Sequence, residues 1–143
     1  MKTGPRQHPT PTTRPRALHA VLWAAQILLA LVFVGGGIWK LTTPIAELAE
    51  VFPWVGQTPP ALLYTTSGFD VLGGLGVLLP ALTRIQPRLT VLAALGCVAL
   101  QASAIAFHLS RDETDVAFNV VLIALAAFVA WGRHTRAPIT PRS

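Results

Sequence analysis

A single carboxylate, Asp70, lies near the middle of a long apolar run, from Ala61 to Leu79. If this run crosses a bilayer as a helix, an aspartate at its centre costs about 2.5–3.5 kcal/mol, so the acid requires a partner or a function. Small or polar residues dominate the helical face that Asp70 shares with Leu63, Thr66, Ser67, Gly73, Gly74 and Val77. The opposite face is bulky and carries Leu62, Phe69, Leu72 and Leu79. We therefore expect Asp70 to face other helices of a bundle.

Three other apolar runs each carry polar residues on one helical face. The first run has a face from Gln26 to Lys40, the third has Gln101 and His108, and the fourth begins with Asn119. We expect Lys40, His108 and Asn119 to gather toward the outer side of the bundle. The candidate ligand-binding residues are Asp70, His108, Lys40, Asn119, Gln101, Tyr64 and Thr66.

A direct pair between Asp70 and Lys40 stays open at this point. Asp70 lies about ten residues after Pro60, which corresponds to about 15 Å along a helix and exceeds the easy reach of a lysine. Thr66, Tyr64 or a water molecule could bridge the gap, or the second helix could begin below the interface.

Each candidate also has a plainer structural explanation. Lys40, at the end of a run, can extend its ammonium group to lipid headgroups. His108 can form interfacial hydrogen bonds, and Asn119 and Gln101 can tie helices together. For Asp70 the alternative to a functional role is a purely structural ion pair.

Motifs for metal binding, nucleotide binding and covalent catalysis are absent from the sequence, which has no HExxH, no GxSxG and no GxxxxGK[ST]. Three of the four histidines lie in or near the two tails, so a haem held by His108 and a second histidine within the bundle is disfavoured. Cys97 is the only cysteine, and we expect it to be a small buried residue. We expect no catalytic residue, no metal site and no cofactor held by the chain itself, so any electron carrier would belong to a partner or ligand.

Four apolar runs of membrane-spanning length organise the sequence. A crossing needs roughly 17 to 25 mostly apolar residues. The composition, 52% hydrophobic and only 12% charged, also fits a membrane chain better than a soluble one, in which about a quarter of residues are charged. The runs are Ala17 to Ile38, Ala61 to Leu79, Leu89 to Phe107 and Val116 to Trp131.

The charges sort by sign between the two sides of these runs. Of the five polar segments, the odd-numbered ones hold nine of the eleven Lys and Arg residues and no acid, whereas the even-numbered ones hold five of the six acids. This positive-inside pattern predicts a protein that crosses the membrane four times, with both termini cytoplasmic. The same placement explains the sequence pI of 10.7 by topology and anionic lipid, so we expect no nucleic-acid partner.

The remaining segments define the boundaries. Residues 1–16 are rich in Pro, Thr and Arg and are expected to be a flexible tail, residues 17–133 a single four-span domain, and residues 134–143 a second flexible tail. Thr43 and Pro44 predict the N-cap and first residue of a short amphipathic helix at the outer interface, which ends at Pro53 with Trp54 as a headgroup anchor. The second span is predicted to end at Pro80. The fold class is therefore all-α, a four-helix transmembrane bundle with a short interfacial helix between spans 1 and 2.

A set of motifs occurs in a fixed order along the chain. They are GIWKL at Gly37 to Leu41, GFDVLGGLGVLLP at Gly68 to Pro80 followed by ALT, then His108, Arg111, Glu113 and Asn119, and AAFVAWGR ending at Arg133. From about Val21 to Arg133 the sequence resembles the DoxX-like family of small bacterial membrane proteins, which implies a four-helix transmembrane bundle. One departure is that the second-span acid, usually glutamate in the family, is here Asp70. Aspartate is one methylene shorter than glutamate. The resemblance further implies a location in the bacterial cytoplasmic membrane.

The resemblance also implies a direction for function. The family takes its name from a membrane subunit associated with a thiosulfate:quinone oxidoreductase, and some relatives are linked to oxidative-stress complexes. We therefore expect an accessory subunit, or a bundle that binds a lipophilic, quinone-like ligand, linked to membrane redox processes.

Two alternatives remain. The first is a structural partner protein without a ligand. The second is a proton-coupled exporter, although small multidrug transporters carry their acid in the first helix and this first helix has none. The expected partners are the lipid bilayer and either a membrane redox protein or a second copy of the chain.

Overall fold

The structure is a computed structural model that describes residue 4 and residues 14–143. Every regular element in this part is helical: α1 (Arg14–Thr42), α2 (Ile45–Val51), the 3₁₀ helix η1 (Pro53–Gln57), α3 (Pro60–Thr83), α4 (Arg88–Leu109), α5 (Ala117–Trp131) and the π-helical turn η2 (Gly132–Arg136). Four stretches are long and apolar enough to cross a membrane, namely α1, α3, α4 and α5 together with η2. The predicted all-α, four-span architecture is confirmed.

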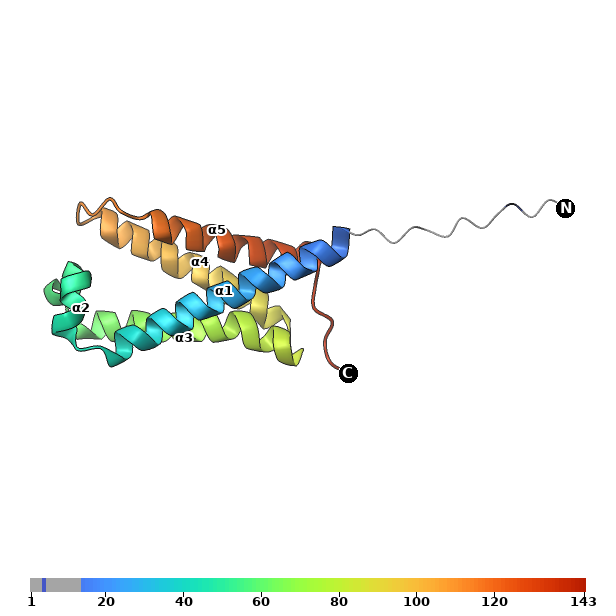
Figure 1. Cartoon of the computed structure of the whole chain (residues 1–143), viewed down its shortest axis with the longest axis horizontal. Helices are drawn as coiled ribbons and strands as arrows, with labels where there is room; N and C mark the ends of the chain where they lie inside the picture. Colours follow the sequence, from blue (N-terminus) through green and yellow to red (C-terminus); the bar gives the residue numbers. More distant parts are fainter. Residues whose placement is uncertain (1–3, 5–13) are drawn as a thin grey trace.

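The four long helices close into a ring in which each contacts two neighbours. α1 packs against α3 and α5, α3 packs against α4, and α4 packs against α5. The start of α1 and the C-terminal segment lie at one end of the bundle, and α2 lies at the other (Figure 1). We call these the terminal end and the α2 end.

Apolar side chains cover the outside of the bundle as well as its core. Leu31, Leu72 and Leu92 are each more than 60% exposed, and the bulky α3 face predicted to contact lipid is exposed throughout. Soluble monomers rarely expose apolar surface on this scale. The outer surface is therefore suited to lipid.

The second span does not end at Pro80 as predicted. Pro80 lies inside α3, which continues to Thr83 and ends where Arg84 adopts a left-handed backbone with φ 56°. A proline lacks the N–H that would bond the carbonyl four residues earlier, so the Gly76 carbonyl loses its helical donor. The side-chain amide of Gln26 on α1 donates to the neighbouring Val77 carbonyl at 2.9 Å. This bond from another helix helps the chain to remain helical through the proline.

The short helix between the first two long helices is present, with a different start. Pro44 is its N-cap residue rather than its first helical residue, and no side chain caps it. After it the chain forms η1, which the sequence did not predict. Trp54 of η1 is partly buried, edge-on to Phe107 and His108 with ring centroids 5.7 and 6.4 Å apart, and so packs on α4 rather than serving only as a headgroup anchor.

The two predicted tails are only partly described. Helix α1 already begins at Arg14, and the rest of the predicted N-terminal tail, apart from Gly4, lies outside the described residues. At the other terminus, η2 extends to Arg136, and the backbone N–H of Arg142 donates to the Arg84 carbonyl at 2.8 Å. The C-terminal segment therefore lies against the α3–α4 turn.

A glycine allows the closest approach of α1 to α3. A Cβ added at Gly37 would lie 2.7 Å from Val71 Cγ2 and 2.8 Å from the Ser67 carbonyl oxygen, whereas a Cβ at the adjacent Gly36 would meet nothing within 4 Å. The Ser67 oxygen belongs to the α3 backbone, so it cannot rotate away. The two glycines therefore form a matched pair for substitution.

We expect Gly37→Ala to lower the free energy of unfolding by about 1–3 kcal/mol, the usual effect of overpacking. Gly36→Ala should be neutral or slightly stabilising, because alanine is the better helix former. Thermal unfolding of the detergent-solubilised variants, followed by circular dichroism, measures both. Equal melting temperatures for the two variants would show that α1 and α3 are not closely packed at Gly37.

Candidate functional site

The embedded acid pairs directly with a lysine of the neighbouring helix. Lys40 Nζ lies 2.5 Å from Asp70 Oδ2, and Asp70 is only 7% exposed. Helical side chains lean toward the N-terminus of their helix, so Lys40 reaches back along α1 toward Gly37. A Cβ at Gly37 would lie 3.2 Å from Asp70 Cβ, which places the two helices at the same level there. The direct pair left open by the sequence is therefore formed.

A second polar pair joins α4 to α5. Asn119 Nδ2 donates a hydrogen bond of 2.7 Å to Gln101 Oε1, and Gln101 is 8% exposed. Asn119 supplies an N–H donor and Gln101 an acceptor oxygen, so neither of these two polar atoms is left unpaired toward lipid. This arrangement agrees with the helix-tying role considered for both residues.

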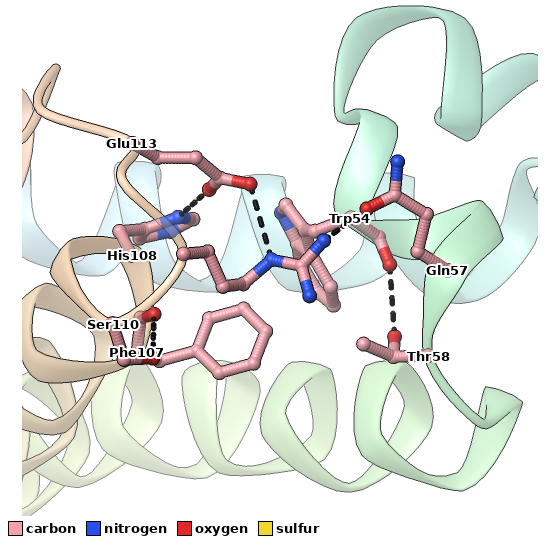
Figure 2. Close-up of polar contacts among 8 residues, drawn as sticks. Trp54, Gln57, Thr58, Phe107, His108, Ser110 and Glu113 are labelled. Carbon is pink, nitrogen blue, oxygen red and sulfur yellow. Dashed lines mark hydrogen bonds and ion pairs between the residues drawn. The ribbon is translucent and has the colours of Figure 1, made fainter.

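A third polar cluster ties the loop after α4 to η1 at the α2 end (Figure 2). One carboxylate oxygen of Glu113 lies 2.5 Å from His108 Nδ1, and the other accepts a bond of 3.2 Å from Arg111 Nε. The guanidinium of Arg111 also donates to Gln57 Oε1 and lies over the Phe107 ring, 5.4 Å from its centroid. Figure 2 shows Glu113 beside His108, with Gln57 facing them from the other segment.

The contacts of this cluster shift the pKa of Glu113. The hydrogen bond with His108 holds the pKa of the Glu113 carboxyl below its ordinary value, and Arg111 lowers it further. A depressed pKa means that the folded protein favours the carboxylate. The stability that Glu113 contributes to the fold is therefore fully present above the pKa that Glu113 has in the unfolded chain. It is lost as the pH falls through the pKa of Glu113 in the folded protein.

Two of the predicted site residues take no part in these contacts. Tyr64 is 45% exposed on the outside of α3. The Thr66 hydroxyl donates to the Leu62 carbonyl of its own helix at 2.8 Å.

Lys40, His108 and Asn119 lie near helix ends at the α2 end, but no contact joins all three in the described part of the chain. Each is engaged with a different partner, and no hydrogen bond or ion pair there joins one pair to another. The predicted polar residues therefore serve as separate links between elements.

A polar cluster at the terminal end was not predicted from the sequence. Arg133 is 3% exposed, its Nε donates to Gln26 Oε1 at 2.6 Å, and its Nη1 lies 2.9 Å from His19 Nδ1. Its guanidinium also lies 5.2 Å from the centroid of the Trp23 ring. The available signal was the i, i+4, i+7 spacing of His19, Trp23 and Gln26, which puts them on one face of α1.

An apolar hollow of about 440 Å³ opens between α3 and α4. Small residues form much of its wall, and two of them, Gly73 and Gly96, have no side chain to fill the space. The lining consists of Phe69, Leu72, Gly73, Ala93, Gly96, Cys97, Ala99, Leu100 and Ser103. None of the predicted ligand-binding residues is in this lining, although Gly73 lies one turn after Asp70.

Among the described residues, no three or more His, Cys, Asp and Glu side chains are grouped so that they could hold a metal ion. The Cys97 thiol is buried and free.

The comparison with known families decides what kind of bundle this is. The model of the DoxX-like family matches residues 24–129. The chain belongs to the DoxX-like family. No curated protein and no solved structure gave a match. The matched region of this DoxX-like chain includes the Lys40–Asp70 and Gln101–Asn119 pairs and excludes His19, Trp23 and Arg133.

We expect Glu113→Gln to remove an acid-dependent part of the stability. The wild type should lose melting temperature as the pH falls below about 4.3, the ordinary glutamate pKa, because protonated Glu113 no longer attracts its two partners. The variant should show a smaller loss over that interval, so the two melting temperatures converge in acid. The conservative control is Asp115→Asn, because no hydrogen bond of that side chain occurs in the described cluster. Parallel acid profiles of wild type and Glu113→Gln would contradict the assignment.

Proposed function

We propose that this DoxX-like protein is an accessory membrane subunit that binds a lipophilic, quinone-like molecule between α3 and α4. The observation that carries the proposal is the apolar hollow between these two helices. The chain itself performs no catalysis in this proposal, and electron transfer belongs to the bound molecule or to a partner enzyme.

The size and lining of the hollow support a flat apolar ligand. Ligand pockets usually enclose about 300–1,000 Å³ and are mainly apolar with a few polar groups, and this hollow has about 440 Å³. Its polar atoms are the Ser103 hydroxyl and the Cys97 thiol. Ser103 now donates to the Ala99 carbonyl at 2.8 Å, and a hydroxyl can rotate to donate to a ligand carbonyl instead.

The embedded polar pairs have a positioning role in this proposal. The Lys40–Asp70 pair fixes α3 against α1 one turn before Gly73, and the Gln101–Asn119 pair fixes α4 against α5 one turn after Cys97. Both walls of the hollow are therefore anchored to a neighbouring helix.

A structural subunit without a ligand is the second candidate. It is favoured by the way Asp70, Lys40, Gln101 and Asn119 bond to one another and leave no shared polar surface for a substrate. The proton-coupled exporter is less favoured, because its acid must be released during transport and Asp70 is held by Lys40.

We further propose that the protein lies in the bacterial cytoplasmic membrane with both termini in the cytoplasm. Support comes from the charge asymmetry, because the polar segments at the terminal end carry no acid. The two described ends of the chain also lie at the same end of the bundle (Figure 1).

The substitution Gly96→Phe tests the hollow directly. A Cβ added at Gly96 meets nothing within 4 Å, and Gly96 lines the hollow, so a phenylalanine there is expected to direct its ring into the hollow. We expect purified wild type to bind decylubiquinone in equilibrium dialysis and Gly96→Phe to bind it at least tenfold more weakly. Gly35→Phe is the matched control, because Gly35 also has open space around it and does not line the hollow. Undetectable binding to the wild type, or equal binding to Gly96→Phe, would remove the ligand and leave the structural candidate.

A double-mutant cycle measures whether the embedded pair is a structural link. Asp70→Leu alone should lower the free energy of unfolding by about 3 kcal/mol, because it leaves the Lys40 ammonium without a partner. Adding Lys40→Met should restore most of this loss, since two apolar side chains replace two charges. Chemical unfolding of the detergent-solubilised proteins gives the coupling free energy. Additive losses in the double variant would show that the pair is not a structural link.

A further inference from the structure

A larger cavity, of about 690 Å³, opens at the terminal end of the bundle. It lies between the first turns of α4, the η2 turn and the C-terminal segment from 138 to 141. Its polar walls come from Arg88, Thr90, Arg133 and His134, and its apolar walls include Leu92 and Leu95. The cavity is separate from the α3–α4 hollow, so a ligand bound in it is independent of the quinone-like molecule proposed for that hollow.

The most buried charged side chain in the wall of this cavity is Arg133, which is 3% exposed. Its Nε and Nη1 atoms are occupied by Gln26, by His19 and by the Ala137 carbonyl. Its Nη2 atom has no hydrogen-bond partner among the described residues. The buried Thr90 hydroxyl in the same wall likewise lacks a partner there.

No acidic side chain in this protein neutralises the Arg133 guanidinium. The sequence has six acidic residues, of which five belong to the polar segments of the α2 end. The sixth, Asp70, is held by Lys40. The Trp23 ring face attracts the cation but carries no net charge. A buried charge without a counter-ion is strongly unfavourable, so the Arg133 guanidinium favours binding of an external anion.

We propose that this cavity binds the headgroup phosphate of an anionic phospholipid. Arg133 provides the buried cation, Arg88 extends the cationic wall, and His134 and Thr90 add polar groups to it. Guanidinium groups match phosphate oxygens in charge and geometry. Basic pockets of this kind between membrane helices are suited to acidic lipid headgroups.

The apolar wall favours a lipid over a free anion. Leu92 and Leu95 lie one and two turns after Arg88 on α4 and are 64% and 52% exposed. An acyl chain can therefore lie along α4 while its phosphate occupies the cationic wall. A zwitterionic headgroup brings its own ammonium group next to the Arg88 and Arg133 guanidinium groups, so an anionic headgroup is preferred.

Lipid retention by the purified full-length chain tests this site. We expect native mass spectrometry of delipidated protein, supplied with phosphatidylglycerol or phosphatidylcholine, to show at least tenfold tighter binding of phosphatidylglycerol. Arg133→Gln should weaken that binding by at least tenfold. Arg88→Gln should weaken it about five-fold, because an exposed basic group near a membrane surface contributes less.

The controls separate the possible outcomes. Arg16→Gln removes an equally positive, exposed residue that is not in the cavity wall, so it should bind phosphatidylglycerol as the wild type does. Because Arg88 is exposed, Arg88→Gln keeps the test valid if Arg133→Gln fails to fold. Equal retention of the two lipids, or unchanged binding by Arg88→Gln and Arg133→Gln when folded, would overturn the proposal. If inorganic phosphate stabilised the protein as much as phosphatidylglycerol does, the site would bind a small anion and the lipid proposal would be wrong.

Discussion

A lipid bilayer offers no water to satisfy polar groups, and this constraint explains how the helices of this bundle are joined. The Lys40–Asp70 pair joins α1 to α3, and the Gln101–Asn119 pair joins α4 to α5. The bond from Arg133 to Gln26 joins the end of the fourth span to α1. Each polar group forms its bond with a neighbouring helix because lipid cannot provide one. The pairs therefore fix which helices are adjacent and how they are aligned along the bundle axis.

The remaining boundary of the ring, between α3 and α4, is built differently. Among the described residues no side-chain hydrogen bond crosses it, and close contact comes from glycines. A Cβ at Gly73 would lie 2.9 Å from Cys97 Sγ, and one at Gly76 would lie 2.8 Å from Ala93 Cβ. The apolar hollow opens at this same boundary. This interface is held by packing alone, and its open part is apolar, which suits the lipophilic molecule proposed for the hollow.

The sequence predicted the spans and the buried faces well, because hydropathy and the helical period determine both. It predicted individual contacts less well. Tyr64 was included as a candidate, yet it lies six positions before Asp70, a rotation of about 240° around the helix that places it on another face. The doubt over Lys40 came from measuring depth along α3 alone, without the backward lean of a lysine on α1. The Gln26 amide that bonds the Val77 carbonyl near Pro80 is a contact between distant segments that local sequence cannot reveal.

Arg133 shows how one feature of the sequence can have two physical consequences. Counting charges treats every arginine near a span end as an equivalent topological signal, and burial distinguishes them only after the chain folds. Gly132 brings η2 close to α1, since a Cβ there would lie 2.5 Å from a Leu22 methyl carbon, and the next residue is thereby enclosed. The sorting of charge that excludes acids from this end also leaves the enclosed guanidinium without an internal counter-ion. A residue that would orient the chain in the membrane thus also creates a demand for an external anion, and the lipid headgroups at that surface carry one.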